Sequence, residues 1–270
     1  MWVRAVHRGA IVARTSRSRR PLSLPVSVGH ELDQAVDGRL CSAAALGVVD
    51  VDGVQSVGYH GHTRHESGLG ESDRHLVDRL PVGSGTRFDL ASLTKPMVVV
   101  SLVAQDLSCS SPRIELDAPL SRFLKAAQGR PLGEATIAQL LGHASGAPAW
   151  LDFYGQTLQV AASQRRSVLM DRVLGVELER PAGERAVYSD LGYLALGWML
   201  EEVFGAPLDD LFLRQVASPL GLSQSRYRRI GDGSAVAEAD ICATEIWPRR
   251  CRDGHPLCGV VHDDNCAALD

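Results

Sequence analysis

Periodic apolar positions divide the chain into a β-type part followed by a longer helical part. Two runs rich in β-forming residues, Ser42–Val51 and Val54–Tyr59, are joined by Asp52-Gly53. Asp-Gly favours a tight turn whose twist matches that of paired strands, so the two runs predict an antiparallel hairpin. A short helical pattern over Glu31–Arg39 precedes the hairpin.

The middle of the chain, about residues 106–224, carries helical periodicity that glycine and proline interrupt. Helices are predicted over the apolar stretch that follows Lys95 and over four later segments: Ile137–Leu141 (which Thr136 begins), Leu158–Leu174, Leu191–Leu200 and Leu208–Val216. The tail beyond them is short, rich in glycine and cysteine, and shows little regular pattern until Gly259. The order is therefore a β part, a helical block and a short tail.

Length and composition allow a substantial core. The chain has 270 residues, 45% of them hydrophobic, and it can form one large domain or two interleaved subdomains. Its net charge of −4 argues against a nucleic-acid partner. The longest apolar run, Met97–Ala104, is far shorter than the roughly 20 residues that a membrane helix needs, so no membrane span is expected.

The first thirty residues differ from the rest, because they contain six arginines and no acidic residue. They lack a continuous apolar segment of about 7–15 residues, so they do not predict a secretory signal. We interpret residues 1–30 as a basic, disordered arm, which is either a leader or the product of a misplaced start codon. We expect a cytoplasmic protein with reduced thiols.

Cysteine and histidine gather at two places without the spacing of metal sites. Four cysteines and two histidines crowd the tail: Cys242, Cys251, Cys258, Cys266, His255 and His262. No two of these cysteines are separated by the two to four residues that structural zinc sites usually have. A second group, His60, His62, His65 and His75, falls in a polar loop, where histidines are usually solvated. We therefore expect neither a metal nor another cofactor.

The candidate chemistry lies in Phe88–Met97, where Ser92 stands three positions before Lys95. Three positions are about one helical turn, so the lysine amine can reach the serine hydroxyl. The chain has only two lysines against 26 arginines. Arginine stays protonated in proteins, whereas a desolvated lysine can give up its proton and act as a base. The pair is a candidate nucleophile and base; the alternative is a buried helix start whose lysine extends to the surface.

Three segments, in this order, resemble those of a known superfamily. Ser92-Leu93-Thr94-Lys95 is followed, 96 positions after Ser92, by Tyr188-Ser189-Asp190, and Leu140-Leu141-Gly142-His143-Ala144-Ser145-Gly146 lies between them. The chain thereby resembles the serine β-lactamase and penicillin-binding-protein superfamily. It is most similar to the class C β-lactamase-like branch, which also contains esterases and D-alanyl-D-alanine carboxypeptidases. The resemblance covers roughly residues 40–270.

The resemblance implies an α+β fold in which an antiparallel sheet is flanked by helices and carries an inserted helical subdomain. We expect the helical subdomain at about 106–224 and the sheet part at 31–105 and 225–270. In this superfamily a later strand carries a Lys-Thr-Gly or His-x-Gly box, which should lie beyond Gly259–Asn265. No such triplet occurs after Tyr188. We therefore expect an incomplete sheet and a C-terminally truncated chain.

The resemblance also implies acyl transfer on a small-molecule ester or amide. Ser92 would attack the carbonyl, Lys95, Tyr188 or both would take its proton, and water would then cleave the acyl-enzyme. The Ser92 backbone N–H, at the start of a helix, would supply one oxyanion donor, and the second would come from the absent strand.

Asp190 departs from the superfamily pattern, which usually has asparagine there. A carboxylate cannot donate a hydrogen bond to a substrate amide oxygen, and it favours the protonated form of Lys95. We therefore assign Asp190 to substrate binding and expect ester hydrolysis in preference to β-lactamase or peptidase activity. Trp150 is expected to form a wall of the acyl pocket. His143 is expected to be a buried histidine whose hydrogen bond to the backbone holds the Ser145-Gly146 turn.

An incomplete sheet leaves an alternative function, that of a non-catalytic remnant which keeps the helical subdomain as a binding or inert module. Two strands alone are marginally stable, and their unpaired edges favour aggregation. A fluorophosphonate or penicillin adduct on Ser92, absent in Ser92→Ala, separates the two hypotheses. The sequence specifies neither the acyl substrate nor the oligomeric state.

Overall fold

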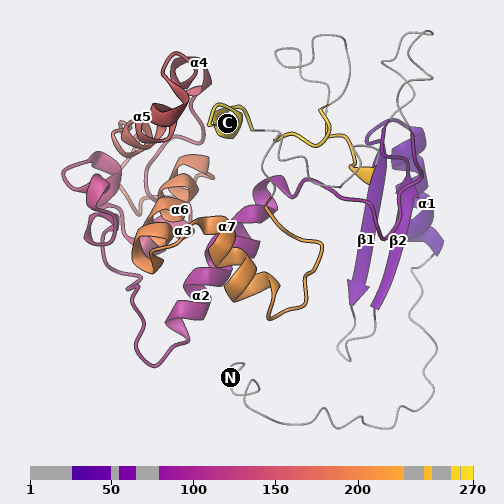
Figure 1. The fold of residues 1–270 in the computed structure, drawn as a ribbon, viewed down its shortest axis with the longest axis horizontal. Helices are drawn as coiled ribbons and strands as arrows, with labels where there is room; N and C mark the ends of the chain where they lie inside the picture. Colours follow the sequence, from indigo (N-terminus) through magenta and orange to yellow (C-terminus); the bar gives the residue numbers. More distant parts are fainter. Residues whose placement is uncertain are drawn as a thin grey trace. The chain divides into compact units, whose positions relative to one another are not determined.

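The computed structural model describes residues 26–49, 55–64, 79–227, 240–244, 257–261 and 263–269. The chain divides into two compact units, Met1–Asp89 with Gly233–His262 and Leu90–Asp232 with Asp263–Asp270 (Figure 1). Several sequence predictions fall outside the described residues: most of the basic arm, the Asp52-Gly53 turn, and His65, His75, Cys251, His255 and His262.

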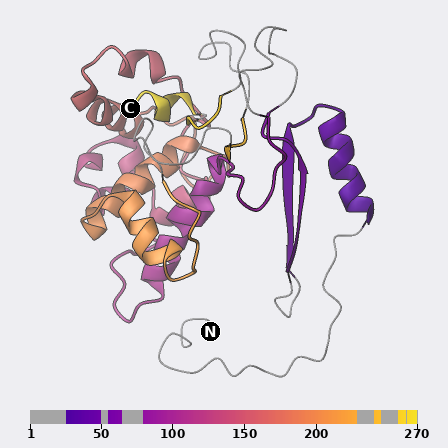
Figure 2. The ribbon, with the colours of Figure 1, turned by 45° about the vertical axis from the view of Figure 1, so that its right-hand side comes forward.

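The first unit contains the predicted hairpin. Strands β1 (Ala43–Val49) and β2 (Gln55–Gly61) pair antiparallel along their whole length, with Ala43 opposite Gly61. Helix α1 (Val26–Asp37) packs against β2, as Figure 2 shows. Asp33 of the helix pairs with His60 of the strand, with 2.6 Å between Oδ1 and Nδ1. The histidine is thus tied to the helix.

Helix α1 begins at Val26, five residues before the predicted start at Glu31. Its apolar residues Val28, Leu32 and Val36 are spaced by four positions and lie on one helix face. The amphipathic pattern therefore extends upstream of the first acidic residue, and the predicted arm boundary at residue 30 falls inside a helix.

The C-terminal part of the chain, in which the sequence shows little regular pattern, forms hydrogen bonds with the segment that follows the hairpin. Arg87 N donates to Asp240 O at 2.9 Å, and Cys242 N donates to Arg87 O at 2.8 Å. Arg64, which is buried, donates to the thiol sulfur of Cys258 at 3.1 Å. These contacts join residues far apart in sequence, so local periodicity could not have indicated them.

The second unit is helical. In chain order its elements are η1 (Ala91–Leu93), η2 (Lys95–Val100), α2 (Ser101–Leu107), η3 (Leu120–Arg122), η4 (Lys125–Ala127), η5 (Pro131–Glu134), α3 (Ile137–Leu141), α4 (Tyr154–Thr157), α5 (Ala162–Leu174), α6 (Asp190–Phe204), α7 (Leu208–Leu211), η6 (Phe212–Ala217) and α8 (Asp264–Ala267). Elements η2 and η6 are π-helical, and the other η elements are 3₁₀ turns. The helix predicted over 158–174 begins at Ala162, and the one predicted over 208–216 changes to π geometry at Phe212.

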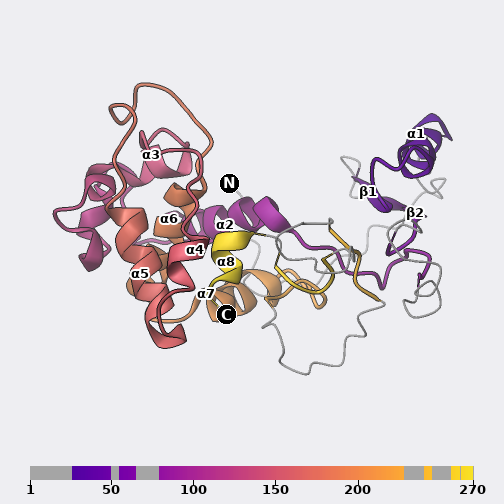
Figure 3. The ribbon, with the colours of Figure 1, turned by 90° about the horizontal axis from the view of Figure 1, so that it is seen from above.

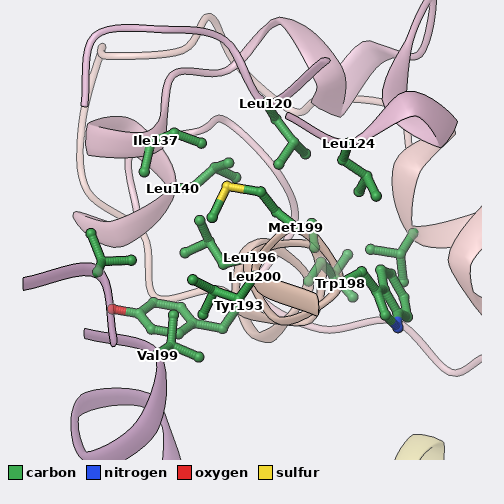
Figure 4. Close-up of a cluster of buried hydrophobic side chains, with 14 of the residues drawn as sticks. Val99, Leu120, Leu124, Ile137, Leu140, Tyr193, Leu196, Trp198, Met199 and Leu200 are labelled. Carbon is green, nitrogen blue, oxygen red and sulfur yellow. The ribbon is translucent and has the colours of Figure 1, made fainter. Parts of the chain in front are cut away.

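Helix α6 lies at the centre of the apolar core (Figure 4). Most of its side chains are apolar, and Leu196 and Met199 are fully buried. Ile137 and Leu140 of α3 pack around them. Burying one such side chain stabilises the fold by about 1.5–3 kcal/mol relative to leaving it exposed. The core therefore fixes the position of α6, whose first residue is Asp190.

Helix α3 has the start and the end that the sequence predicts. The Thr136 hydroxyl accepts from Gln139 N at 3.2 Å, and the Gln139 side chain accepts from Thr136 N at 2.9 Å. This reciprocal pair is a capping box, which satisfies two backbone donors at the helix start. The helix ends at Gly142, and the chain continues into the segment His143–Ala149.

The sequence predicts no helix at α8. Asp263 caps it by accepting from Cys266 N at 2.7 Å. The buried Asn265 side chain donates to Leu151 O at 2.8 Å and accepts from Phe153 N at 2.9 Å. These bonds place α8 beside α4, as Figure 3 shows.

The hairpin with its helix and the helical unit together make the protein α+β, which confirms the predicted fold class. The sheet among the described residues has two strands. Within that described part, no helix has the length and apolar character required to cross a membrane.

Candidate active site

Ser92 lies in the turn η1, directly after a strained residue. Ala91 has a φ of +43°, in the left-handed region, which costs an alanine roughly 1–2 kcal/mol. Leu93 N donates to Leu90 O at 2.8 Å and closes the turn. Ser92 itself is exposed. Strained backbone clusters at functional sites, and here it precedes the candidate nucleophile.

Lys95 reaches Ser92 as predicted, although the helix between them is not regular. Pro96 has no N–H, so it cannot make the bond to the Ser92 carbonyl that a continuous α-helix requires. The chain forms the 3₁₀ turn η1 and then the π-helix η2. Lys95 Nζ donates to Ser92 Oγ at 3.1 Å. The prediction of a regular α-helix over this stretch is therefore wrong, because the stretch forms a 3₁₀ turn and a π-helix. Such π-helical turns are frequent at functional sites.

Asp190 lies next to the lysine. Its Oδ1 is 2.7 Å from Lys95 Nζ, and the two side chains are 33% and 16% exposed. Burial alone would lower the pKa of Lys95, but the contacts with Asp190 and Tyr188 outweigh it, so the pKa of Lys95 lies above its ordinary value of 10.5. The lysine is therefore charged at neutral pH, as the sequence predicts for a carboxylate at this position.

Two tyrosine rings lie beside the ammonium group. Lys95 Nζ is 5.0 Å from the ring centre of Tyr188 and 5.9 Å from that of Tyr193, within the range of a cation–π contact. Tyr188 also contributes to raising the pKa of Lys95. Tyr188 is half exposed, whereas Tyr193 is buried and its hydroxyl donates to Leu141 O at 3.0 Å. Ser92, Lys95, Tyr188 and Asp190 thus share one site.

The segment His143–Ala149 holds Tyr188 and Asp190 by the backbone. Val187 N donates to His143 O at 2.8 Å, and Asp190 N donates to Ala149 O at 3.0 Å. The buried Ser189 hydroxyl donates to Pro148 O at 2.7 Å. Residues on both sides of Tyr188 are therefore fixed by one short segment.

His143 has a different partner from the predicted one. Its Nδ1 accepts from Ser189 N at 3.0 Å, so the ring binds the segment that carries Tyr188 and not the Ser145-Gly146 turn. The histidine is half-buried, with a φ of +57°. Burial, and next the charge of Lys95, lower the pKa of His143. The prediction of a backbone hydrogen bond is confirmed, and the predicted partner is wrong because the contact is 46 residues away in sequence.

The turn after His143 is held by the backbone of Gly146. Its φ is +83°, and a Cβ there would lie 2.1 Å from Arg180 O. Its carbonyl accepts from Glu179 N at 2.9 Å. Only glycine fits this close approach, so the shape of the segment depends on it.

Trp150 and Tyr193 flank the residues described above in the sequence or on helix α6. Trp150 directly follows Ala149 and is 42% exposed, so the backbone places it beside the site, while its role as a pocket wall stays a prediction. Tyr193 was not predicted. It stands three positions after Asp190, and that spacing on one helix face is the signal that could have indicated it.

Two further features of the described residues lie outside the group around Ser92. Among the described residues, His, Cys, Asp and Glu form no group of three that could hold a metal ion. A cavity of about 500 Å³ lies along α7, η6 and the turn after them, lined in part by Phe212, Leu213, Leu222 and Tyr227. None of the candidate catalytic residues lines it.

The chain is similar in sequence to a family of known proteins. The beta-lactamase family profile matches residues 32–235. An Escherichia coli (strain K12) protein named "Putative D-alanyl-D-alanine carboxypeptidase" is 29% identical over 189 residues, which cover 67% of this chain and 41% of that protein. A Bacillus subtilis (strain 168) protein named N-acetylmuramyl-L-alanine amidase is 30% identical over 197 residues, covering 66% of this chain and 43% of its own length.

A solved structure agrees in fold. The beta-lactamase/D-alanine carboxypeptidase from Pseudomonas syringae superposes with a TM-score of 0.64 at 17% identity, over 90% of this chain and 59% of that one. At this identity the likeness concerns the fold alone. The chain spans about two fifths of the length of the curated relatives that it matches.

Proposed function

This chain belongs to the beta-lactamase family, and we propose that it is a serine hydrolase that forms an acyl-enzyme on Ser92 from a small ester or amide. The proposal depends on one observation: Lys95 Nζ contacts both Ser92 Oγ, at 3.1 Å, and Asp190 Oδ1, at 2.7 Å. A serine hydroxyl is a weak nucleophile until a neighbouring base takes its proton. Lys95 is the base within reach.

The reactive form of the site contains the neutral amine of Lys95. Its raised pKa keeps most of the lysine charged at neutral pH; the neutral fraction accepts the Ser92 proton while Oγ bonds to the carbonyl carbon. The Tyr188 ring centre lies 5.0 Å from Lys95 Nζ, and we assign its hydroxyl to passing the proton to the leaving oxygen or nitrogen as that bond breaks. Water then hydrolyses the acyl-enzyme and restores the serine.

Asp190 supports a neutral ester as the preferred substrate. Penicillins and D-alanyl peptides carry a carboxylate, which a positive charge beside the nucleophile would attract. In this site the carboxylate of Asp190, 2.7 Å from Lys95 Nζ, offsets that charge. An anionic substrate therefore gains little from the lysine and is repelled by Asp190.

The names of the relatives favour a second candidate, hydrolysis of an amide. The Escherichia coli protein is named "Putative D-alanyl-D-alanine carboxypeptidase", and the Bacillus subtilis protein is named as an N-acetylmuramyl-L-alanine amidase. The chemistry at Ser92 is the same in both candidates, and only the acyl and leaving groups differ.

The first test is covalent labelling of the whole chain with a fluorophosphonate, in which Ser92 Oγ bonds to phosphorus and fluoride leaves. We expect a single adduct on Ser92, none in Ser92→Ala, and a slow reaction in Lys95→Met. Folding of each variant is verified by circular dichroism. A folded wild-type chain that takes no label refutes the serine hydrolase and favours a non-catalytic module.

The second test ranks substrates. We expect faster turnover of p-nitrophenyl butyrate than of a chromogenic cephalosporin or a peptide ending in D-alanyl-D-alanine. Faster turnover of the cephalosporin or the peptide contradicts the preference for esters and leaves the acyl-enzyme mechanism in place.

A further inference from the structure

His143 contacts the residues on both sides of Tyr188. Its backbone oxygen accepts from Val187 N at 2.8 Å, and its ring Nδ1 accepts from Ser189 N at 3.0 Å. The ring of Tyr188 itself stacks on the His143 ring, with 4.4 Å between centres and an angle of 35°. One residue thus makes two hydrogen bonds and a ring contact around the tyrosine.

We propose that His143 is a positioning residue that holds Tyr188 beside Lys95 through the hydrogen bond from Ser189 N to its neutral ring. This inference rests on the proposed function at Ser92. Tyr188 is half exposed, so one side of its ring faces solvent and has no packing partner to orient it. The ring of His143 on the other side therefore decides where the hydroxyl points.

The hydrogen bond exists in only one protonation state of the histidine. Nδ1 accepts from Ser189 N, so the ring proton of the neutral form is on Nε2. An imidazolium carries N–H groups at both nitrogens and would place two donors against each other at Ser189. Acidification therefore removes the bond and loosens the segment that carries Tyr188.

The surroundings of the ring favour the neutral form. Burial lowers the pKa of His143, and the charge of Lys95 lowers it further, while Ser189 and the carboxylate of Asp190 act in the opposite direction. Two rings pack on it, those of Tyr188 and Tyr193, with ring centres at 4.4 and 4.9 Å. The neutral ring that accepts the hydrogen bond therefore predominates at and above pH 6.5, the ordinary histidine value.

Two variants separate the hydrogen bond from the remainder of the side chain. His143→Asn keeps an acceptor at the position of Nδ1, tolerates the φ of +57°, and cannot titrate. His143→Leu keeps comparable bulk and removes the acceptor. Both variants lose the aromatic ring, and leucine, unlike asparagine, is also strained at this φ. The pH profile of His143→Asn against the wild type therefore carries the test of the titrating acceptor, and the rate of His143→Leu reports the loss of the acceptor together with that strain.

The experiment measures the rate of fluorophosphonate labelling of Ser92 between about pH 5 and pH 9 in the wild type and both variants, with near-UV circular dichroism at each pH. With Lys95 as the base, the logarithm of the rate rises with pH with a slope of one. We expect the wild-type slope to increase toward two below the pKa of His143, and the slope of His143→Asn to stay at one throughout. Near pH 8 we expect His143→Asn to react about tenfold faster than His143→Leu, which leaves Ser189 N without a partner.

A slope change in His143→Asn equal to that of the wild type, or equal rates in the two variants, overturns the inference while the labelled wild type still supports the serine hydrolase. If the folded wild type takes no label at any pH, the proposed function fails. The nitrogen chemical shifts of the His143 ring then decide. The Nε2-protonated form in neutral solution supports the positioning role, and the Nδ1-protonated form refutes it.

Discussion

Replacing Asp190 by asparagine tests how the charge of Lys95 controls Ser92. The substitution keeps the shape of the side chain and removes only the carboxylate charge. A charged hydrogen-bonded pair contributes about 1.5–3 kcal/mol net. Asp190 is 33% exposed, and solvent screening places the pair at the lower end of that range.

That energy sets the expected change in rate. Each 1.4 kcal/mol or so changes an equilibrium about tenfold, so Asp190→Asn raises the fraction of neutral Lys95 about tenfold at any pH well below its pKa. If the neutral amine takes the serine proton, fluorophosphonate labelling of Ser92 accelerates by about the same factor near pH 8, and its alkaline plateau is reached at a lower pH.

The assay is the second-order rate of labelling across pH, with Asp210→Asn as the matched control. Asp210 lies in α7 and pairs with Arg214 at 3.6 Å, in an exposed i,i+4 pair, so its replacement should leave the labelling rate unchanged. If Asp190→Asn reacts at the wild-type rate or more slowly at every pH, Asp190 does not restrain Lys95, and the reasoning on the base is wrong.

Three further predictions concern stability. Asp106→Ala leaves the backbone N–H groups of Arg113 and Ile114 without their buried acceptor, which binds each at 2.9 Å. Urea unfolding should show a loss of about 1–3 kcal/mol per group, and no loss would contradict the packing of α2. Gly146→Ala should prevent correct folding or lower the melting temperature strongly, whereas Gly155→Ala, where a Cβ meets nothing within 4 Å, should be neutral or stabilising; equal effects would refute the close approach. Because the pKa of Lys95 is raised, its ion pair stabilises the fold fully below pH 10.5 and less as the pH rises above that value. The difference in unfolding free energy between wild type and Lys95→Met should therefore shrink at alkaline pH, and a constant difference argues against the pair.

The sequence predicts those parts of the molecule that depend on neighbouring residues. The hairpin, helix α3 with its start at Thr136, and the apolar helix α6 all follow from local periodicity and turn chemistry, and the structure confirms them. The reach of Lys95 to Ser92 is equally local, since the two residues stand three positions apart.

The remainder depends on contacts between distant residues. The ring of His143 binds Ser189, which is 46 residues away in sequence. The strained backbone of Ala91, at the start of the turn η1, is likewise not indicated by its neighbours in sequence. Helix α8 is four residues long and has little apolar pattern of its own; its contacts with Leu151 and Phe153 place it. Local sequence patterns contain no information on such contacts, so they indicated the candidate catalytic residues and not the residues that hold them.

The bonds of Asn265 have a consequence for biosynthesis. The side chain closes onto the backbone of Phe153 across 112 residues and onto Leu151 across 114. During translation those backbone groups leave the ribosome well before their partner exists, at a synthesis rate of about 5–20 residues per second. The region around α4 therefore lacks these two hydrogen bonds for several seconds during synthesis. During this interval its backbone is accessible to chaperones or proteases.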